Sequence, residues 1–200
     1  DTEGASLSTG NFGSERRTVQ ASPAVSGNTL YVGARDGFLY ALSADSGTLR
    51  WRFDHKISWV NTSPAVLDNV VYAGSSDGQF VQAVDAATGT ERWRARTGVV
   101  WSSPAVAGDV LYVGDGAGRL HAIDRQTGGL LWAFRTGSQV WGSPTPAGDM
   151  VVFGSTDGGV SALRVADAAP VHRAVFFDST LINAAWTPDP ALLARFFVNR

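Results

Sequence analysis

Short apolar runs, separated by polar or glycine-containing pairs, follow one another along most of the chain. The first four runs have the sequences Ser-Pro-Ala-Val-Ser (22–26), Thr-Leu-Tyr-Val-Gly (29–33), Phe-Leu-Tyr-Ala-Leu (38–42) and Leu-Arg-Trp-Arg-Phe (49–53). Runs of this length that are rich in Val, Leu, Tyr and Phe are typical of β-strands. The pairs between them, Gly27-Asn28, Asp36-Gly37 and Ser46-Gly47, contain residues that accept the positive φ of tight turns. The pattern predicts four short antiparallel strands joined by hairpins.

The same set of runs recurs with a period of 40 or 41 residues, which is the spacing between successive Ser-Pro pairs at 22, 63, 103 and 143. Three further columns keep nearly the same period: Gly33, Gly74, Gly114 and Gly154; Ala41, Ala83, Ala122 and Ala162; and Trp51, Trp93 and Trp132. Agreement between independent columns is a strong sign of a structural repeat. The sequence therefore predicts four repeats, at about 18–58, 59–99, 100–139 and 140–170.

One four-stranded sheet cannot bury both of its faces, but stacking such sheets around an axis buries them and leaves only short edges. The predicted fold is therefore all-β, a β-propeller of four-stranded antiparallel blades. Propellers usually close with about four to eight blades. Four repeats can form a small ring, half of a ring that a second chain completes by self-association, or part of a larger ring. An open ring exposes sheet edges, so association is expected unless the ring closes.

The second repeat differs from the others in one spacing. The turn glycine precedes the strand alanine by four residues in the first repeat (Gly37 to Ala41) and by five in the second (Gly78 to Ala83). One inserted residue would reverse the faces of a strand unless a bulge absorbs it. The spacing predicts a β-bulge within residues 79–82.

The two ends of the sequence do not follow the repeat. Residues 1–17 are polar and rich in Gly and Ser, as in a flexible lead or the remnant of a preceding blade. Residues 171–200 form a diverged tail or the start of a further segment, with a predicted strand at 173–178 and a predicted helix at 191–197 that Asp189-Pro190 begins. Alternatively, residues 182–185 echo residues 60–63 and open a fifth repeat. The first interpretation is favoured because a helical pattern is foreign to the repeat.

Residues 85–93 (Asp-Ala-Ala-Thr-Gly-Thr-Glu-Arg-Trp) and 124–132 (Asp-Arg-Gln-Thr-Gly-Gly-Leu-Leu-Trp) resemble the PQQ-type β-propeller repeat. This repeat is found in quinoprotein alcohol dehydrogenases, in outer-membrane assembly lipoproteins of the BamB family and in bacterial sensor kinases. The resemblance covers about residues 18–165 and implies a ring that commonly has seven or eight blades. It indicates the fold and leaves the function open.

In this family, the Asp-x-x-Thr-Gly turn and the tryptophan four residues after its glycine join neighbouring blades. The resemblance assigns one joint to Asp85, Thr88, Gly89 and Trp93 and the next to Asp124, Thr127, Gly128 and Trp132, and it gives Trp51 the same structural role in the first repeat. The first repeat departs from the motif at Ser43. The fourth repeat departs from it at every position, with Arg164, Asp167, Ala168 and His172.

Composition narrows the chemistry that the chain can carry. The formal net charge of −2 gives no basic surface for nucleic acid, and the absence of cysteine excludes disulfides and Cys-based zinc sites. No apolar run is long enough for a membrane span. His55, His121 and His172 are spaced too widely for a local metal motif, so surface or packing roles are expected. No residue is assigned a catalytic or metal-binding role.

Four residues occupy the position two before each Ser-Pro pair: Gln20, Asn61, Trp101 and Trp141, with Trp59 close by. The first strand of a blade lies nearest the propeller axis, so these five side chains are expected around one mouth of the central channel. Aromatic and amide groups in such a place can bind a planar ligand or a peptide, or they can simply plug the axis.

The sequence favours a non-catalytic binding or scaffold module, similar to an assembly factor or a sensor domain, with a protein or peptide partner and no cofactor. The alternative is part of a PQQ-dependent quinoprotein dehydrogenase. That resemblance would imply PQQ over a tryptophan floor, Ca²⁺ held by Glu and Asn, an Asp base and often a vicinal disulfide. The chain has no cysteine and few glutamates, so the alternative is disfavoured. The resemblance implies a periplasmic or extracellular location, although the sequence from Asp1 shows no signal peptide.

Overall fold

The computed structural model describes residues 18–56 and 58–175 of the 200-residue chain, and they form four antiparallel sheets of four strands each. The strands of the first two sheets are β1 (Ala24–Ser26), β2 (Thr29–Gly33), β3 (Phe38–Ser43), β4 (Leu49–Asp54), β5 (Ala65–Leu67), β6 (Val70–Ser75), β7 (Phe80–Asp85) and β8 (Glu91–Arg96). Those of the last two are β9 (Ala105–Ala107), β10 (Val110–Gly114), β11 (Arg119–Asp124), β12 (Leu130–Arg135), β13 (Thr145–Ala147), β14 (Met150–Gly154), β15 (Gly159–Arg164) and β16 (Pro170–Val175). The predicted all-β fold with four propeller blades is confirmed.

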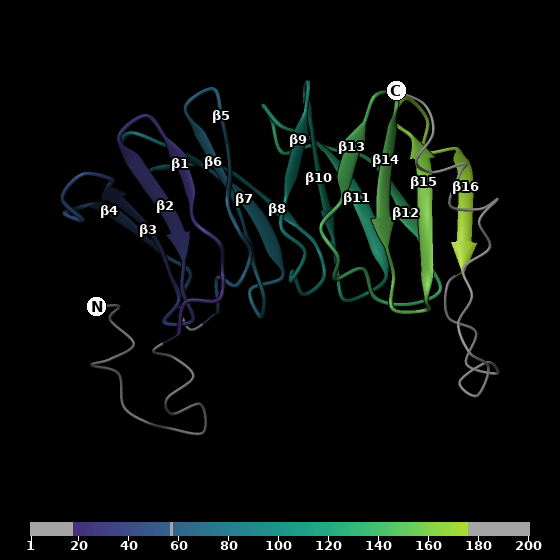
Figure 1. Ribbon diagram of the computed structural model, residues 1–200, viewed down its shortest axis with the longest axis horizontal. Coiled ribbons are helices and arrows are strands. Elements are labelled where there is room, and N and C mark those ends of the chain that lie inside the picture. The colour runs from purple at the N-terminus through teal and green to yellow at the C-terminus, as the bar shows by residue number, and fades with distance from the viewer. Residues whose placement is uncertain (1–17, 57, 176–200) are drawn as a thin grey trace.

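The four sheets stand side by side in an arc, with the first and fourth sheets at opposite ends (Figure 1). Neighbouring sheets contact each other through their short first strands, β1 with β5, β5 with β9, and β9 with β13. These strands therefore form the inner edge of the arc, and the fourth strands form the outer edge. The described residues contain no helix that is long and apolar enough to cross a membrane.

The extra residue of the second repeat lies in a hairpin turn. The β6–β7 ladder runs without interruption from Val70↔Asp85 to Ser75↔Phe80, so the bulge predicted within residues 79–82 is wrong. In the other repeats, a glycine with positive φ directly precedes the third strand, whereas Gln79 (φ 56°) takes this place in the second repeat. Because the left-handed residue moves with the insertion, strand β7 keeps its faces.

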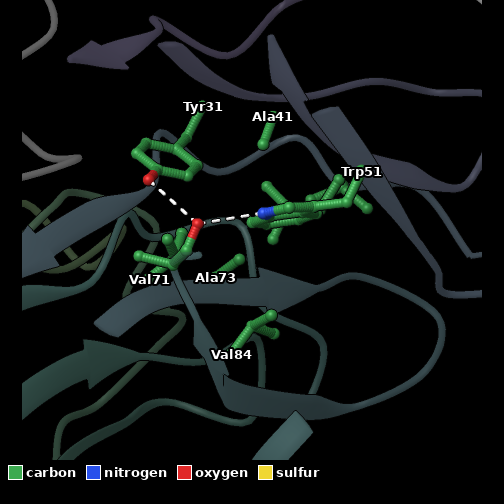
Figure 2. Packing of buried hydrophobic residues seen from close by; sticks show 9 residues of the cluster. Tyr31, Ala41, Trp51, Val71, Ala73 and Val84 are labelled. Atoms are coloured by element: carbon green, nitrogen blue, oxygen red, sulfur yellow. Dashed lines mark hydrogen bonds between the residues drawn. The ribbon is translucent and has the colours of Figure 1, made fainter. Parts of the chain in front are cut away.

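The hydrophobic core is divided into clusters between neighbouring sheets. Figure 2 shows the first cluster, in which Tyr31, Ala41 and Trp51 of the first sheet pack against Val71 and Val84 of the second. Every residue of β6 is buried, because a central strand of an inner blade has a neighbouring sheet on each face. The outer strands β8 and β12 instead alternate exposed and half-buried positions. Each sheet is therefore stabilised mainly by its neighbours.

Gly33, Gly74 and Gly114 lie where the segment before the first strand of the next repeat passes close to a sheet. A Cβ atom on Gly114 would lie 2.4 Å from Cγ1 and 2.5 Å from the carbonyl oxygen of Val140, a residue with no exposed surface. Gly33 and Gly74 meet Val60 and Val100 in the same way. At Gly154 no atom of residues 18–56 and 58–175 lies closer than 3.9 Å to such a Cβ. Glycine is thus required where a following repeat packs.

Strand β16 crosses the predicted boundary at residue 170, because its residues Pro170–Val175 pair with β15 and complete the fourth sheet. The fourth repeat therefore extends to Val175. The lead at 1–17, the helix predicted at 191–197 and the fifth repeat suggested by residues 182–185 lie outside the described residues.

Replacing Gly114 by alanine should destabilise the protein, since Cβ would overlap backbone and side-chain atoms of Val140 that cannot easily move. We expect a loss of about 1–3 kcal/mol in the free energy of unfolding, measured by urea denaturation. Gly154→Ala is the matched control and should change stability by less than about 0.5 kcal/mol. Equal effects of the two substitutions would contradict this role for the glycine column.

Candidate functional site

Each of the three docking tryptophans donates a hydrogen bond from its indole N–H to a backbone carbonyl of the next repeat. The donor–acceptor distances are 2.9 Å for Trp51 to Ala86, 2.9 Å for Trp93 to Arg125 and 3.1 Å for Trp132 to Val165. The acceptor always follows the first residue of the Asp-x-x-Thr-Gly turn or its counterpart. Figure 2 shows Trp51 in this position, with the hydroxyl of Tyr31 donating to the same oxygen.

The turn glycine lies directly beneath the docked indole. Gly89 has a φ of +74°, and a Cβ at this position would lie 2.7 Å from Cδ2 of Trp51. The side chain of Asp85 closes the turn by accepting hydrogen bonds from the backbone N–H groups of Ala87 and Thr88 and from the Thr88 hydroxyl. A hydrogen bond from Arg92 and those from Thr88 and Ala87 lower the pKa of Asp85 to about 2. Asp124, Thr127 and Gly128 form the equivalent turn beneath Trp93.

The structure changes which motif residues belong to one joint. The resemblance grouped Trp93 with Asp85, Thr88 and Gly89, but the indole on that turn is Trp51, and Trp93 lies on the turn that begins at Asp124. The tryptophan follows its own turn by four residues on the fourth strand, and there its side chain faces the next sheet. A joint therefore combines the tryptophan of one repeat with the turn of the next.

The fourth repeat keeps the shape of the turn although its sequence has diverged. Ala168 adopts a φ of 57°, as the turn glycines do, and its N–H donates to the carbonyl of Arg164 at 3.0 Å. Val165 still accepts the hydrogen bond from Trp132. The backbone of the joint is thus kept although the Asp, Thr and Gly of the motif are replaced by Arg164, Asp167 and Ala168.

The Ser-Pro column forms a second joint along the inner edge. The backbone N–H of Ser22 donates to Oγ of Ser63 at 2.9 Å, Ser63 donates to Ser103 at 2.9 Å, and Ser103 donates to Ser143 at 3.1 Å. In the sequence, these serines indicate the period. Their recurrence is the only sequence signal for this role, and it does not show that each hydroxyl accepts a hydrogen bond from the backbone of the preceding repeat.

The rings of two of the five predicted channel-mouth residues stack on each other. The rings of Trp101 and Trp141 have centroids 5.1 Å apart and planes inclined by 27°, while the two residues remain 44% and 42% exposed. Trp59 instead lies under the guanidinium of Arg35, whose central carbon is 3.7 Å from the ring centroid. Gln20 is exposed, and Asn61 is half-buried. A pocket of about 330 Å³ adjoins Trp141 and is also lined by Gly154, Ser155, Thr156 and Val160.

Buried polar pairs lie beside the third strands, a feature that sequence analysis missed. Nε2 of His121 is 2.8 Å from a carboxylate oxygen of Asp115, and the same carboxylate accepts hydrogen bonds from the backbone N–H groups of Gly98, Ala117 and Arg119. Burial acts to raise the pKa of Asp115, but the hydrogen bonds from His121 and the backbone outweigh it and hold the pKa below its usual value. Through Asp115, the pair links the β10–β11 hairpin to the segment that precedes the third sheet.

His55 occupies a second buried site between aromatic rings. Its ring centroid lies 5.6 Å from that of Phe53 and 5.1 Å from that of Phe80, and its Nε2 is 2.7 Å from the Gln82 amide. Desolvation by burial, with a smaller contribution from the nearby Arg94, lowers the pKa of His55 to about 3, although Asp54 opposes this shift. The imidazole is therefore neutral in the folded protein at neutral pH.

Folding stability should fall as the pH drops below about 6.5, because His55 then gains a proton in the unfolded chain but not in the folded one. The expected contribution is full above pH 6.5 and decreases by roughly 1.4 kcal/mol per pH unit between pH 6 and 4.5. Urea denaturation at several pH values measures it. His55→Gln should reduce this slope, and an unchanged slope would contradict the assignment.

Replacing Trp51 by alanine should lower the free energy of unfolding by about 3–5 kcal/mol, because this substitution removes a buried indole and its hydrogen bond. Trp101→Ala provides a matched control, since Trp101 is exposed, and we expect it to cost less than about 1 kcal/mol. Urea denaturation compares the two. A larger loss for Trp101 than for Trp51 would refute the structural role of the docking residue.

Comparison with solved structures places the fold among known propellers. BamB from Moraxella catarrhalis superposes with a TM-score of 0.71 at 20% identity, over 81% of this chain and 54% of that one. Quinohemoprotein alcohol dehydrogenase from Comamonas testosteroni gives 0.73 at 19% identity, over 81% and 35%. The computationally designed Ika4 protein gives 0.67 at 26% identity, over 74% and 91%. The chain spans about half the length of the BamB structure. No curated protein matches it in sequence.

A family profile described as outer membrane protein assembly factor BamB matches residues 1–99 and 79–175. These matches cover all four sheets, the docking turns and the Ser-Pro column. The structural likeness to BamB and to quinohemoprotein dehydrogenases supports the same fold. The chain therefore belongs to the BamB-like PQQ repeat family of β-propellers, as its repeat motif indicated.

Proposed function

We propose that this propeller is a non-catalytic binding module that holds a peptide segment of a protein partner at the inner edge of the arc. The stacked and exposed pair Trp101–Trp141 is the observation that carries the proposal. Indoles are rigid, offer a large contact area and are enriched among residues that dominate binding energy. Two of them held together in the segments before the first strands of the third and fourth sheets form a fixed platform.

The architecture around the platform supports this role. Trp101 and Trp141 lie four residues before the first residues of strands β9 and β13, and the serine joints of the inner edge lie two residues further along the chain. The pair is therefore held on a rigid part of the fold. Aromatic platforms of this kind bind extended segments that carry proline or aromatic side chains.

The quinoprotein alternative fits the described residues poorly. No group of three or more His, Asp or Glu side chains in residues 18–56 and 58–175 is arranged to hold a metal ion. His121 hydrogen-bonds to Asp115, but no serine or threonine hydroxyl of the described residues is hydrogen-bonded to either side chain. The pair therefore has no nucleophile beside it. We derive no catalytic step for these residues.

The family resemblance also supports a periplasmic or extracellular setting for the module, with partners similar in kind to those of an assembly factor or a sensor domain. BamB, whose fold this chain shares, is described as an outer membrane protein assembly factor. This location is part of the proposal.

The binding role is tested with a displayed library of random peptides. The library is selected on the wild-type protein and depleted on the Trp101→Ala/Trp141→Ala double variant. Peptides enriched in this way should bind the wild type at micromolar affinity in calorimetry and lose at least tenfold in affinity for the double variant. Leu131→Ala, an exposed residue on the outer strand β12, is the control and should leave binding unchanged.

Two results would overturn the proposal. One is enrichment of peptides that bind the double variant as well as the wild type. The other is saturable quenching of tryptophan fluorescence by PQQ with Ca²⁺, accompanied by alcohol oxidation, which would restore the quinoprotein alternative.

A further inference from the structure

We infer that the partner segment held by the Trp101–Trp141 platform is a proline-rich stretch in the polyproline II conformation. Its proline rings pack on the two indoles, and its carbonyl oxygens accept hydrogen bonds from the indole N–H groups. The inference rests on the proposed binding function, to which it adds the composition and the backbone conformation of the ligand.

The indole N–H groups of the platform differ from those of the docking tryptophans. Trp51, Trp93 and Trp132 each donate to a backbone carbonyl of the next repeat, at 2.9, 2.9 and 3.1 Å. The N–H groups of Trp101 and Trp141 have no hydrogen-bond acceptor among the described residues, although the two rings are held by stacking. A tryptophan at a binding surface offers an apolar face together with one donor. The platform therefore presents two donors that a ligand can use.

The hydroxyl of Ser102 fixes the two tryptophan segments relative to each other. It has no exposed surface, accepts a hydrogen bond from the N–H of Gly114 at 3.1 Å and donates to the carbonyl of Gly142 at 3.1 Å. Ser102 and Gly142 directly follow Trp101 and Trp141 in the chain. Because these segments are joined inside the fold, the indoles are already in place before a ligand arrives, and binding costs less ordering entropy.

The strands next to the platform are poorly suited to bind a ligand by β-strand addition. Strands β9 and β13 have three residues each, and they already contact each other along the inner edge. Pro104 and Pro144 come directly before these strands, and Pro146 is the central residue of β13. Proline has no N–H to donate to a ladder, so these positions cannot pair with an added strand. The side chains of the platform must therefore recognise the ligand.

A polyproline II segment matches a platform of this kind. It has no internal hydrogen bonds, so its carbonyl oxygens are free to accept from the two indole N–H groups. Its conformation is preformed, and proline-rich segments dock on surfaces lined by aromatic side chains. Residues 99–103 and 139–143, which surround the two indoles in the sequence, include no charged side chain. The segment that fits is therefore uncharged where it touches the platform.

Acetylated decaproline amide is the probe, titrated into the isotope-labelled protein while the indole N–H signals are followed by NMR. The signals of Trp101 and Trp141 should shift in a saturable way. Those of Trp51, Trp93 and Trp132 are internal controls and should not move, because these donors are already paired. An acetylated decapeptide amide of alternating Gly and Ser is equally long and uncharged, and it should bind at least tenfold more weakly.

The double variant Trp101→Phe/Trp141→Phe separates hydrogen bonding from packing, since phenylalanine keeps an aromatic face but has no N–H. We expect its affinity for decaproline to be about tenfold lower than that of the wild type, as the loss of two hydrogen bonds implies. Trp101→Ala/Trp141→Ala should lose more, because it removes the faces as well. Leu131→Ala, on the outer strand, should bind as the wild type does.

Equal binding of the proline and Gly-Ser peptides would overturn the inference, as would equal affinity of the wild type and the phenylalanine variant for decaproline. Library peptides that depend on Trp101 and Trp141 but keep their affinity after every proline is replaced by alanine would also overturn it, while leaving the proposed function intact. A library without any platform-dependent peptide would instead remove the proposed function, and this inference with it.

Discussion

The indole that each repeat places on the turn of the next one is the contact on which the rest of the structure depends. A four-stranded sheet with apolar residues on both faces is unstable alone, so each blade needs a neighbour in a fixed orientation. Trp51 meets this need by filling the space above Gly89 and by donating its N–H to Ala86. Since a buried N–H without an acceptor is costly, the hydrogen bond also fixes the distance between the sheets.

Two other kinds of contact also hold neighbouring sheets together. At the inner edge, the serine hydroxyls accept from the backbone of the preceding repeat, and nearby the valine column fills the space left by Gly33, Gly74 and Gly114. Each of the three internal interfaces thus has a tryptophan joint, a serine joint and a valine packed against a glycine. Stability in such an array is a sum of repeat and nearest-neighbour contributions, so the two end faces differ in kind from the internal ones.

A fold held in this way leaves its inner edge available for recognition. Trp101 and Trp141 remain 44% and 42% exposed, and the docking turns are occupied by Trp51, Trp93 and Trp132. The buried Asp115–His121 pair instead holds a hairpin within the third repeat, and His55 contacts Gln82 of the second sheet. The proposed binding function therefore rests on residues that the architecture does not otherwise use.

The strands, the turns, the period and the family could be predicted from the sequence, because each depends on local pattern and on columns that recur about every 40 residues. The sequence could not determine that Trp51 rather than Trp93 docks on the turn at Asp85, since that depends on the sense in which consecutive sheets stack. The sequence also suggested a bulge for the extra residue of the second repeat, because only the ladder shows that Gln79 adopts the left-handed turn conformation before an unbroken strand. The stacking of Trp101 on Trp141 and the pairing of His121 with Asp115 join side chains whose directions are fixed only when the sheets pack. Tertiary structure decided these contacts, because periodicity specifies which positions are equivalent but not which of them meet.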